Sequence, residues 1–352
     1  MGIKTIAFGG DTSLGYRYFQ NPKWESILNR VKNDPTSFFS EVETSLKDID
    51  HLVLNLETVI SETEGVPAPG KLYCGIDDPE NTLKCLSYVG AKTVSLANNH
   101  AMDFGVEKLL ETIVHLQTAG IEVIGAGTSR KQSLKPAVIK VNEGTEKSRN
   151  VYVIGALRAP KRYSEYGFFA KSNKAGLART TALRIDEAVK NIKEKDPNGF
   201  VVYYPHWQGC DYGSVTDVIA KYCRDRVDNG VDLIIGHGTH TIGNIENYKG
   251  ALILHSIGNF VFNTQGQFAK TGAPPFGMIV KLEFKGPSSL DYPALKVLPL
   301  LTDNRETSFR TTSKAAVDQL ERSGIYKSAL SLDGVSFKHD NNGWLEVSFN
   351  NR

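Results

Sequence analysis

Short apolar runs alternate with amphipathic stretches along the chain up to about residue 276. The amphipathic stretches carry helix start and stop signals and predict helices over residues 35–47, 79–89, 105–119, 181–195 and 215–229. The apolar runs are rich in Val, Ile and Leu, as buried strands are, and predict strands over residues 4–8, 51–54, 93–96, 122–124, 151–154, 200–204, 233–235 and 251–255. This alternation predicts an α/β fold.

The pattern changes in the last part of the chain. It predicts antiparallel strands over residues 277–284 and 294–300, a helix over 314–322 and a last strand over 344–348. We therefore expect one main domain over residues 1–300 and a C-terminal extension over 301–352 that packs on the same domain.

Residues 158–179 are aromatic and basic and show no clear period. A long irregular loop inside a compact domain is often functional, so this segment is a candidate lid or substrate loop. A solvated insertion is the alternative interpretation.

Composition narrows the class of protein. The chain has 352 residues and a formal net charge of +2, which is too small to indicate a nucleic acid or an anionic membrane as partner. Its four cysteines lack CxxC spacing, so we expect free thiols. No window reaches the roughly 20 apolar residues of a membrane span. We expect a soluble, cytoplasmic protein, with a removed N-terminal leader as an open alternative and the oligomeric state undetermined.

Polar residues follow the predicted strands in a regular way. In a parallel or mixed sheet the carboxyl ends of neighbouring strands face one crevice, so these residues can meet in space. A single strand-end Asp is usually a cap, and a single His is usually packed in a core, but the ordered set favours a metal site: Asp11, Glu57, Asn99, His206, His237 and His240. Carboxylates, an amide and imidazoles together suit a divalent Mn, Fe or Zn ion.

These segments resemble a known family. The motifs on which the resemblance rests are GGDTSLG (9–15), NLE (55–57), LANNHAMDFG (96–105), HWQG (206–209), GHGTH (236–240) and SIGNFVF (256–262). Together and in this order they resemble the CapA family of poly-gamma-glutamate (capsule) synthesis proteins, within the calcineurin-like metallophosphoesterase superfamily. The resemblance implies an α/β sandwich with mixed sheets and helices on the outside.

The resemblance also implies roles. Asp11 and His240 would bind a first metal, Glu57 would take the bridging place, and the second metal would have Asn99, His206 and His237. His100 would contact substrate or donate a proton. For Asp103 we favour a cap on the helix that starts near Gly105, with orientation of His100 as the alternative, and Asn259 would fix a neighbouring loop.

The chain departs from the superfamily pattern at the first metal. Ser13 stands where a histidine is usual, Glu57 is longer than the usual aspartate, and the last motif is His-x-x-His. One ion or two are therefore both open, and ordinary phosphatase activity is in doubt.

The sequence leaves three functions open. The first is a metal-dependent hydrolase of an amide or phosphoester in an anionic substrate, linked to polyglutamate or capsule metabolism, with Arg158 and Lys161 holding the anion. The second is a non-hydrolytic, polyglutamate-binding accessory protein of polymer synthesis. The third is a degenerate fold kept for protein interaction, which the six retained ligand positions disfavour.

Overall fold

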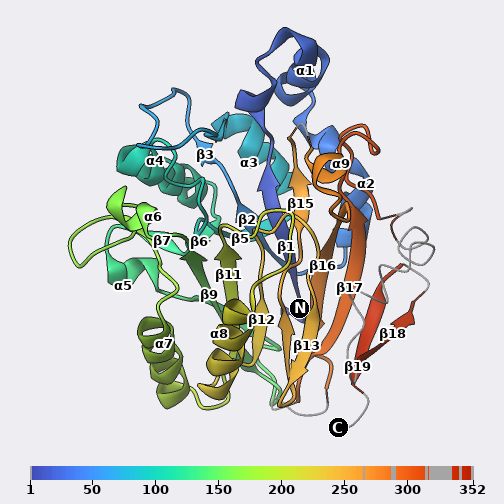
Figure 1. Ribbon diagram of the computed structural model, residues 1–352. Helices are drawn as coiled ribbons and strands as arrows, with labels where there is room; N and C mark the ends of the chain where they lie inside the picture. Colours follow the sequence, from blue (N-terminus) through green and yellow to red (C-terminus); the bar gives the residue numbers. More distant parts are fainter. Residues whose placement is uncertain are drawn as a thin grey trace.

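Two mixed sheets pack face to face, with helices on both outer faces (Figure 1). The computed structural model describes residues 2–264, 266–286, 291–313, 316, 335–340 and 343–349. This architecture confirms the predicted α/β sandwich. No helix in the described part of the chain is both long and apolar enough to cross a membrane.

The larger sheet has an antiparallel half and a parallel half, which meet at the strand of residues 5–13. In spatial order its strands are β18 (Val335–His339), β19 (Leu345–Phe349), β17 (Ala294–Leu301), β16 (Phe276–Glu283), β1 (Thr5–Ser13), β2 (His51–Leu56), β5 (Ala91–Ser95) and β6 (Glu122–Ile124). A further strand, β15 (Asn259–Phe262), pairs with the end of β1.

The smaller sheet has a parallel centre and antiparallel edges. Its strands are, in spatial order, β13 (Ile245–Tyr248), β14 (Ala251–Leu254), β12 (Leu233–Ile235), β11 (Phe200–Trp207), β9 (Arg149–Arg158) and β8 (Ala137–Val141). Two short pairs lie outside the sheets: β3 (Val59–Ile60) with β4 (Ile76–Asp77), and β7 (Ala126–Gly127) with β10 (Gly176–Leu177).

Alternation along the strands assigns each side chain to a face. Ile6 and Phe8 of β1 meet Val202 and Tyr204 of β11 in the core between the sheets. The intervening residues point outward, where Tyr203 joins the core beneath the helices of the smaller sheet.

The helices cover the two outer faces (Figure 1). They are α1 (Glu25–Asn33), α2 (Ser40–Glu43), α3 (Pro79–Tyr88), α4 (Gly105–Thr118), α5 (Arg130–Ser133), α6 (Arg162–Glu165), α7 (Ala182–Lys195), α8 (Asp217–Asp228) and α9 (Phe268–Thr271). Short 3-10 turns are η1 (Tyr16–Phe19), η2 (Pro22–Trp24), η3 (Pro35–Phe38) and η4 (Thr44–Leu46).

Most of the predicted elements are confirmed, but the helix over residues 35–47 is wrong. That segment is divided into η3, α2 and η4. The Ser37 hydroxyl donates to the carbonyl of Asp34, and the Ser40 hydroxyl donates to the carbonyl of Ser37. Such side-chain bonds compete with the helical ladder, and the buried Phe38 and Phe39 anchor the broken form in the core. No pattern in the sequence indicated α1, whose one buried residue is Val31.

The segment over residues 158–179 is more ordered than the sequence indicated. It contains α6 and β10, and Tyr163, Phe168 and Phe169 are buried in the core. A solvated insertion is therefore wrong for its aromatic residues, whereas Lys171 and its neighbours up to Lys174 are exposed.

The C-terminal strands β18 and β19 extend the larger sheet beside β17. The predicted helix over residues 314–322 lies almost wholly outside the described residues, and the boundary at residue 300 stays a prediction. The four cysteines are free, as predicted.

Candidate metal centre

The imidazoles of the smaller sheet continue the inner face of their strands. His206 follows Tyr204 by two positions on β11, and His237 lies two positions after Ile235, just beyond the end of β12. The two histidines form an isolated parallel bridge that prolongs the pairing of β11 with β12. Period-2 alternation therefore turns both rings toward the space between the sheets.

A bulge on β1 brings Asp11 to the same space. Gly9 pairs with Leu54 and Asp11 pairs with Asn55, so one extra residue lies on β1 at Gly10. A Cβ on Gly10 would lie 1.7 Å from the carbonyl oxygen of Gly258. Only glycine permits this close approach, and the bulge gives Asp11 the inward direction that strict alternation would give to residue 10.

Asp11 is fully buried at the centre of the cluster. Its Oδ1 lies 3.4 Å from His237 Nδ1 and 3.7 Å from His206 Nδ1, and its Oδ2 lies 3.1 Å from His240 Nδ1. Asn55 Nδ2 donates to Oδ1 at 2.8 Å. Burial opposes ionisation, but hydrogen bonds from His237 and His240 outweigh it and hold the pKa of Asp11 well below its usual range.

His206 joins the two halves of the centre. Its Nε2 lies 2.8 Å from Asn99 Oδ1, and its Nδ1 lies 3.0 Å from His237 Nδ1. Burial, together with neighbouring histidines, holds the pKa of His206 well below its usual range despite Asp11. A neutral imidazole is the form that binds metal.

Glu57 has a buried carboxylate without a partner. The side chain is 1% exposed, and neither oxygen accepts a hydrogen bond within the part of the chain that the structure describes. Its Oε1 lies 3.7 Å from His206 Nε2 and 3.8 Å from His100 Nε2. Burial and the charge of Asp11 raise the pKa of Glu57 well above its usual value. His237 Nε2 is likewise buried without a partner among the described residues.

These orphaned atoms fit a bound cation, because a buried carboxylate is costly unless it is paired or coordinates metal. Two sets of ligand atoms lie within 4.8 Å of one another: Asp11 with His206 and His237, and Asp11 with Glu57 and His240. Asp11 is common to both sets, whereas the resemblance assigned the shared place to Glu57. The mixture of oxygen and imidazole ligands suits one or two Mn, Fe or Zn ions.

Asp103 orients His100, so the favoured helix cap is wrong. Its Oδ2 lies 2.6 Å from His100 Nδ1 and accepts a hydrogen bond from the Gly75 amide at 2.7 Å. Helix α4 instead begins after Phe104 and has no side-chain cap. Burial lowers the pKa of His100, while Asp103 acts in the opposite direction.

Lys71 completes this arrangement, and no pattern in the sequence marked it. Its side chain is 7% exposed, and Nζ lies 2.8 Å from Asp103 Oδ1 and donates to the carbonyl of Asn99 at 2.9 Å. A lysine within a Pro- and Gly-rich loop looks like a solvated residue. Only the contact across the fold shows that it neutralises the buried Asp103.

Asn98 was also missed, although it lies inside a quoted motif. Its amide group donates to Asn55 Oδ1 and to the carbonyl of Leu56, and its Oδ1 accepts from the amides of His100 and Ala101. Asn98 thus shapes the turn that carries Asn99 and His100.

Two further residues have structural contacts. The Ser13 hydroxyl donates to the buried Asp77 Oδ2 at 3.0 Å. Asn259 Oδ1 lies 2.9 Å from His240 Nδ1, so Asn259 holds a histidine of the cluster.

The structure does not bring Arg158 or Lys161 into contact with this cluster. Arg158 is level with Trp207, whose ring packs against Tyr222 of α8 on the outer face of the smaller sheet. The Lys161 side chain is 90% exposed and pairs with Glu165 at 3.6 Å. Their substrate-binding role stays a prediction.

Known proteins resemble this chain along most of its length. The family model "Bacterial capsule synthesis protein PGA_cap" matches residues 5–264. The "Probable polyglutamine synthesis accessory protein" of Mycobacterium tuberculosis is 29% identical over 333 residues, 85% of this chain and 84% of that protein. The "PGA biosynthesis protein CapA" of Bacillus subtilis is 27% identical over 262 residues, 74% of this chain and 64% of that protein.

A solved structure shows a weaker likeness. The crystal structure of a hypothetical protein from Thermus thermophilus aligns with a TM-score of 0.42 and 14% identity, over 83% of this chain and 98% of that one. The family match includes β1, β2, β11 and β12, whose ends carry the candidate centre. The chain therefore belongs to the bacterial capsule synthesis protein family PGA_cap.

Proposed function

We propose that the protein is a metal-dependent hydrolase that acts on an amide or phosphoester in an anionic substrate. The observation that carries the proposal is the carboxylate of Glu57, which accepts no hydrogen bond from a described residue and is buried beside Asp11 and the imidazoles of His206 and His240. Buried polar atoms without hydrogen-bond partners are costly, and a bound cation would pair with them and remove that cost.

Each side chain has a distinct task in this proposal. Asp11 would hold the cation or cations, with His206, His237 and Asn99 on one side and Glu57 and His240 on the other. A bound divalent ion polarises the scissile group and lowers the pKa of a water. The protein withdraws the ligand atoms from bulk water, since the six side chains are buried or nearly so.

His100 is the residue that would move a proton. Its Nε2 points to the side of Glu57, and Asp103 fixes the ring through Nδ1. Lys71 pairs with Asp103, so the negative charge of that buried carboxylate is neutralised. A proton held at Nε2 can pass to a leaving group that lies between His100 and the cluster.

The relatives support polyglutamate or capsule metabolism as the setting. Their printed names refer to polyglutamine synthesis and PGA biosynthesis. These names also support the second candidate, a non-hydrolytic accessory protein that binds the polymer. The Ser13 hydroxyl donates its hydrogen bond to Asp77 and does not replace the missing imidazole. The first metal site is then weaker, which favours this second candidate.

Metal analysis and turnover together test the proposal. Elemental analysis of the purified protein should find Mn, Fe or Zn, and His206→Ala and His237→Ala should lose most of it. His115→Ala is the matched control, because His115 lies on α4 beside Glu111 and away from the cluster. The metal-loaded protein is then assayed with p-nitrophenyl phosphate esters and gamma-glutamyl amides.

The outcomes separate the two candidates. Metal retention in both histidine variants would overturn the centre itself. The protein could instead bind metal tightly and bind the polymer, yet turn over neither substrate. That result would reject the hydrolase and support the accessory protein.

A further inference from the structure

A basic groove is lined by residues of α5 and α7 on the flank of the smaller sheet. Figure 1 shows both helices on that flank. It encloses about 420 Å³. Its floor is apolar and includes Leu134, Tyr152 and Ile192, and its charged residues are Lys131, Arg184, Glu187 and Lys195. The groove contains no residue of the candidate metal centre.

One face of α7 carries the wall of this basic groove. Arg184, Ala188, Asn191 and Lys195 follow one another at spacings of four, three and four residues, so they lie on one side of the helix. At a rise of about 1.5 Å per residue, Arg184 and Lys195 stand about 16 Å apart along the axis. Cations at this separation match an extended ligand rather than a single small anion.

Positive charge accumulates near the Arg184 end with no ion-pair partner among the described residues, although the Arg179 guanidinium lies over the ring of Phe169. Burial and the charges of Arg130 and Arg179 lower the pKa of Arg184, and only Glu187 opposes them to a smaller degree. None of these three arginines forms an ion pair with a described residue, and Arg130 Nε is buried without an acceptor in the same part of the chain. Neighbouring guanidinium groups repel one another, so an anion bound among them would be stabilised.

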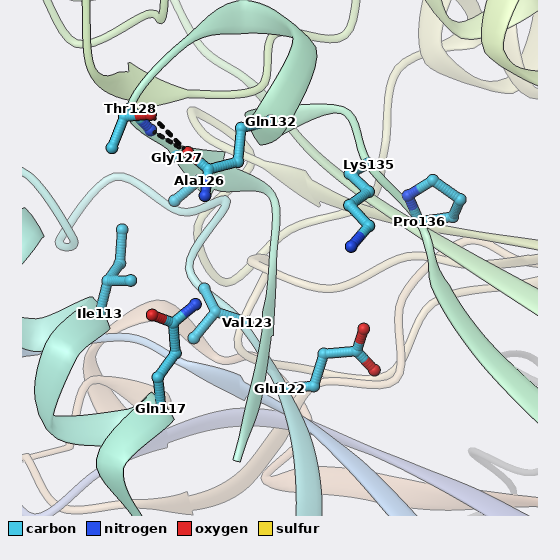
Figure 2. A pocket seen from close by; sticks show the side chains of 10 residues that line it. All are labelled: Ile113, Gln117, Glu122, Val123, Ala126, Gly127, Thr128, Gln132, Lys135 and Pro136. Carbon is cyan, nitrogen blue, oxygen red and sulfur yellow. Dashed lines mark hydrogen bonds between the residues drawn. The ribbon is translucent and has the colours of Figure 1, made fainter. Parts of the chain in front are cut away.

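A second hollow beside the groove lacks these features. It encloses about 120 Å³ and shares Pro136 with the groove. Figure 2 shows Lys135 and Glu122 reaching toward it from two sides, while Gln132 is bound by Thr128. Its opposite charges balance and its volume is small, so it offers no site for a long anion.

We propose that the basic groove binds a segment of a flexible polycarboxylate chain. The Arg184 guanidinium can pair with a carboxylate in a two-pronged contact, and the Lys195 ammonium can bind a second carboxylate at the other end of α7. Two cations so far apart need a ligand with several carboxylates. The aliphatic floor fits the methylene stems between those carboxylates. Single-stranded nucleic acid prefers stacked aromatic rings, but the hydroxyl of Tyr152, the one aromatic residue that lines the groove, is engaged by Asp196.

Arg179 forms a bridge with Leu157, and Leu157 is level with His206 in the smaller sheet. None of these three residues lines the groove. The binding itself is independent of the proposed hydrolase.

Fluorescence anisotropy with a labelled poly-gamma-glutamate oligomer tests the basic groove. Arg184→Gln combined with Lys131→Gln should raise Kd by about tenfold, since two exposed ion pairs are lost. Lys190→Gln is the control on the same helix: it removes one charge from a side chain that is 76% exposed and paired with Glu194 outside the groove. It should change Kd by less than about twofold. Binding of the unaltered protein should weaken with added salt.

The inference is overturned by equal weakening in the control variant, by equal affinity for an oligophosphate of the same length, or by no binding at all. His206→Ala provides the distinction from the proposed hydrolase. It should bind the oligomer as tightly as the unaltered protein, even though its metal is lost. If His206→Ala abolishes binding and the groove variant retains it, the polymer binds at the metal centre and the basic groove has no such role.

Discussion

The two sheets make different contributions to the candidate metal centre. The larger sheet and its loops supply the oxygen ligands Asp11, Glu57 and Asn99, whereas the smaller sheet and its loops supply the imidazoles of His206, His237 and His240. Neither half is a site alone, because every set of ligand atoms that lies close together contains members from both sheets. Metal binding should therefore depend on the packing of one sheet on the other, and should stabilise that packing.

The largest effect is expected from Asp11→Asn, on the oxygen side. Asp11 belongs to both sets of ligand atoms, so its loss should remove all bound metal and lower any turnover by more than about 100-fold. Elemental analysis and the hydrolase assay measure the two effects. Asparagine keeps the size of the side chain, so circular dichroism should be unchanged. Retention of one ion would show that Asp11 is not shared.

Removal of the metal with a chelator is the next test, because it affects the oxygen ligands of the larger sheet and the imidazoles of the smaller sheet together. Metal that binds only the folded state at about 100 times its Kd adds about 2.7 kcal/mol of stability. Removing it should lower the thermal midpoint of the unaltered protein, while the His206→Ala variant should show little further change. An identical drop in both would mean that the chelated metal lies elsewhere.

Glu57→Gln should have opposite effects with and without metal. Burial raises the pKa of Glu57, so the metal-free fold carries the cost of this carboxylate, and a neutral isostere should stabilise it by on the order of 1 to 2 kcal/mol. The same change should weaken metal binding. Urea unfolding with and without metal measures the change in stability in each form. If the metal-free variant is less stable than the unaltered protein, Glu57 is not an uncompensated buried carboxylate.

Lys71→Met should affect chemistry but not metal content. Lys71 acts on His100 through Asp103, so we expect kcat to fall about tenfold with KM little changed. The positive charge of Lys71 lowers the pKa of His100, so its removal should move the corresponding limb of the pH–rate profile to higher pH. Lys71→Arg should restore part of the rate. A merely structural role would leave the profile unmoved.

The last test lies outside the candidate metal centre, at the far end of β2, where His51 begins the strand. Burial and the charge of Lys92 lower the pKa of His51 from 6.5 to about 4. The folded protein therefore binds fewer protons there than the unfolded chain, so this stability is complete above pH 6.5 and is lost as the pH falls toward 4. The loss of unfolding free energy should reach about 2 kcal/mol. Urea unfolding at several pH values should show a smaller pH dependence of stability in His51→Asn.

Local sequence predicted most of the strands and the strand ends at which the candidate ligands stand. Period-2 alternation carries Phe200, Val202 and Tyr204 into the core and makes His206 the next inward residue, and glycines end the helices at predictable places. The order of the motifs was enough to indicate a metal site and the family. These features depend on neighbours in the chain, which a single sequence displays.

Contacts across the fold could not be predicted in this way. The inward direction of Asp11 depends on a bulge that the backbone of Gly258 imposes at Gly10. The partner of Asp103 proved to be His100 rather than a helix end, and Lys71 reaches Asp103 from a distant loop. The grouping of Lys131 with Arg184 at the basic groove likewise needs α5 and α7 side by side.

The sequence by itself thus determined which elements form, and which residue types stand at the carboxyl ends of the strands. Only the tertiary structure decided which of those residues share one buried space, which carboxylate is common to both sets of ligands, and which charges remain unpaired. The physical reason is that hydrophobic periodicity is a local property of the chain, whereas burial and electrostatic pairing depend on distances that exist only after the two sheets have packed.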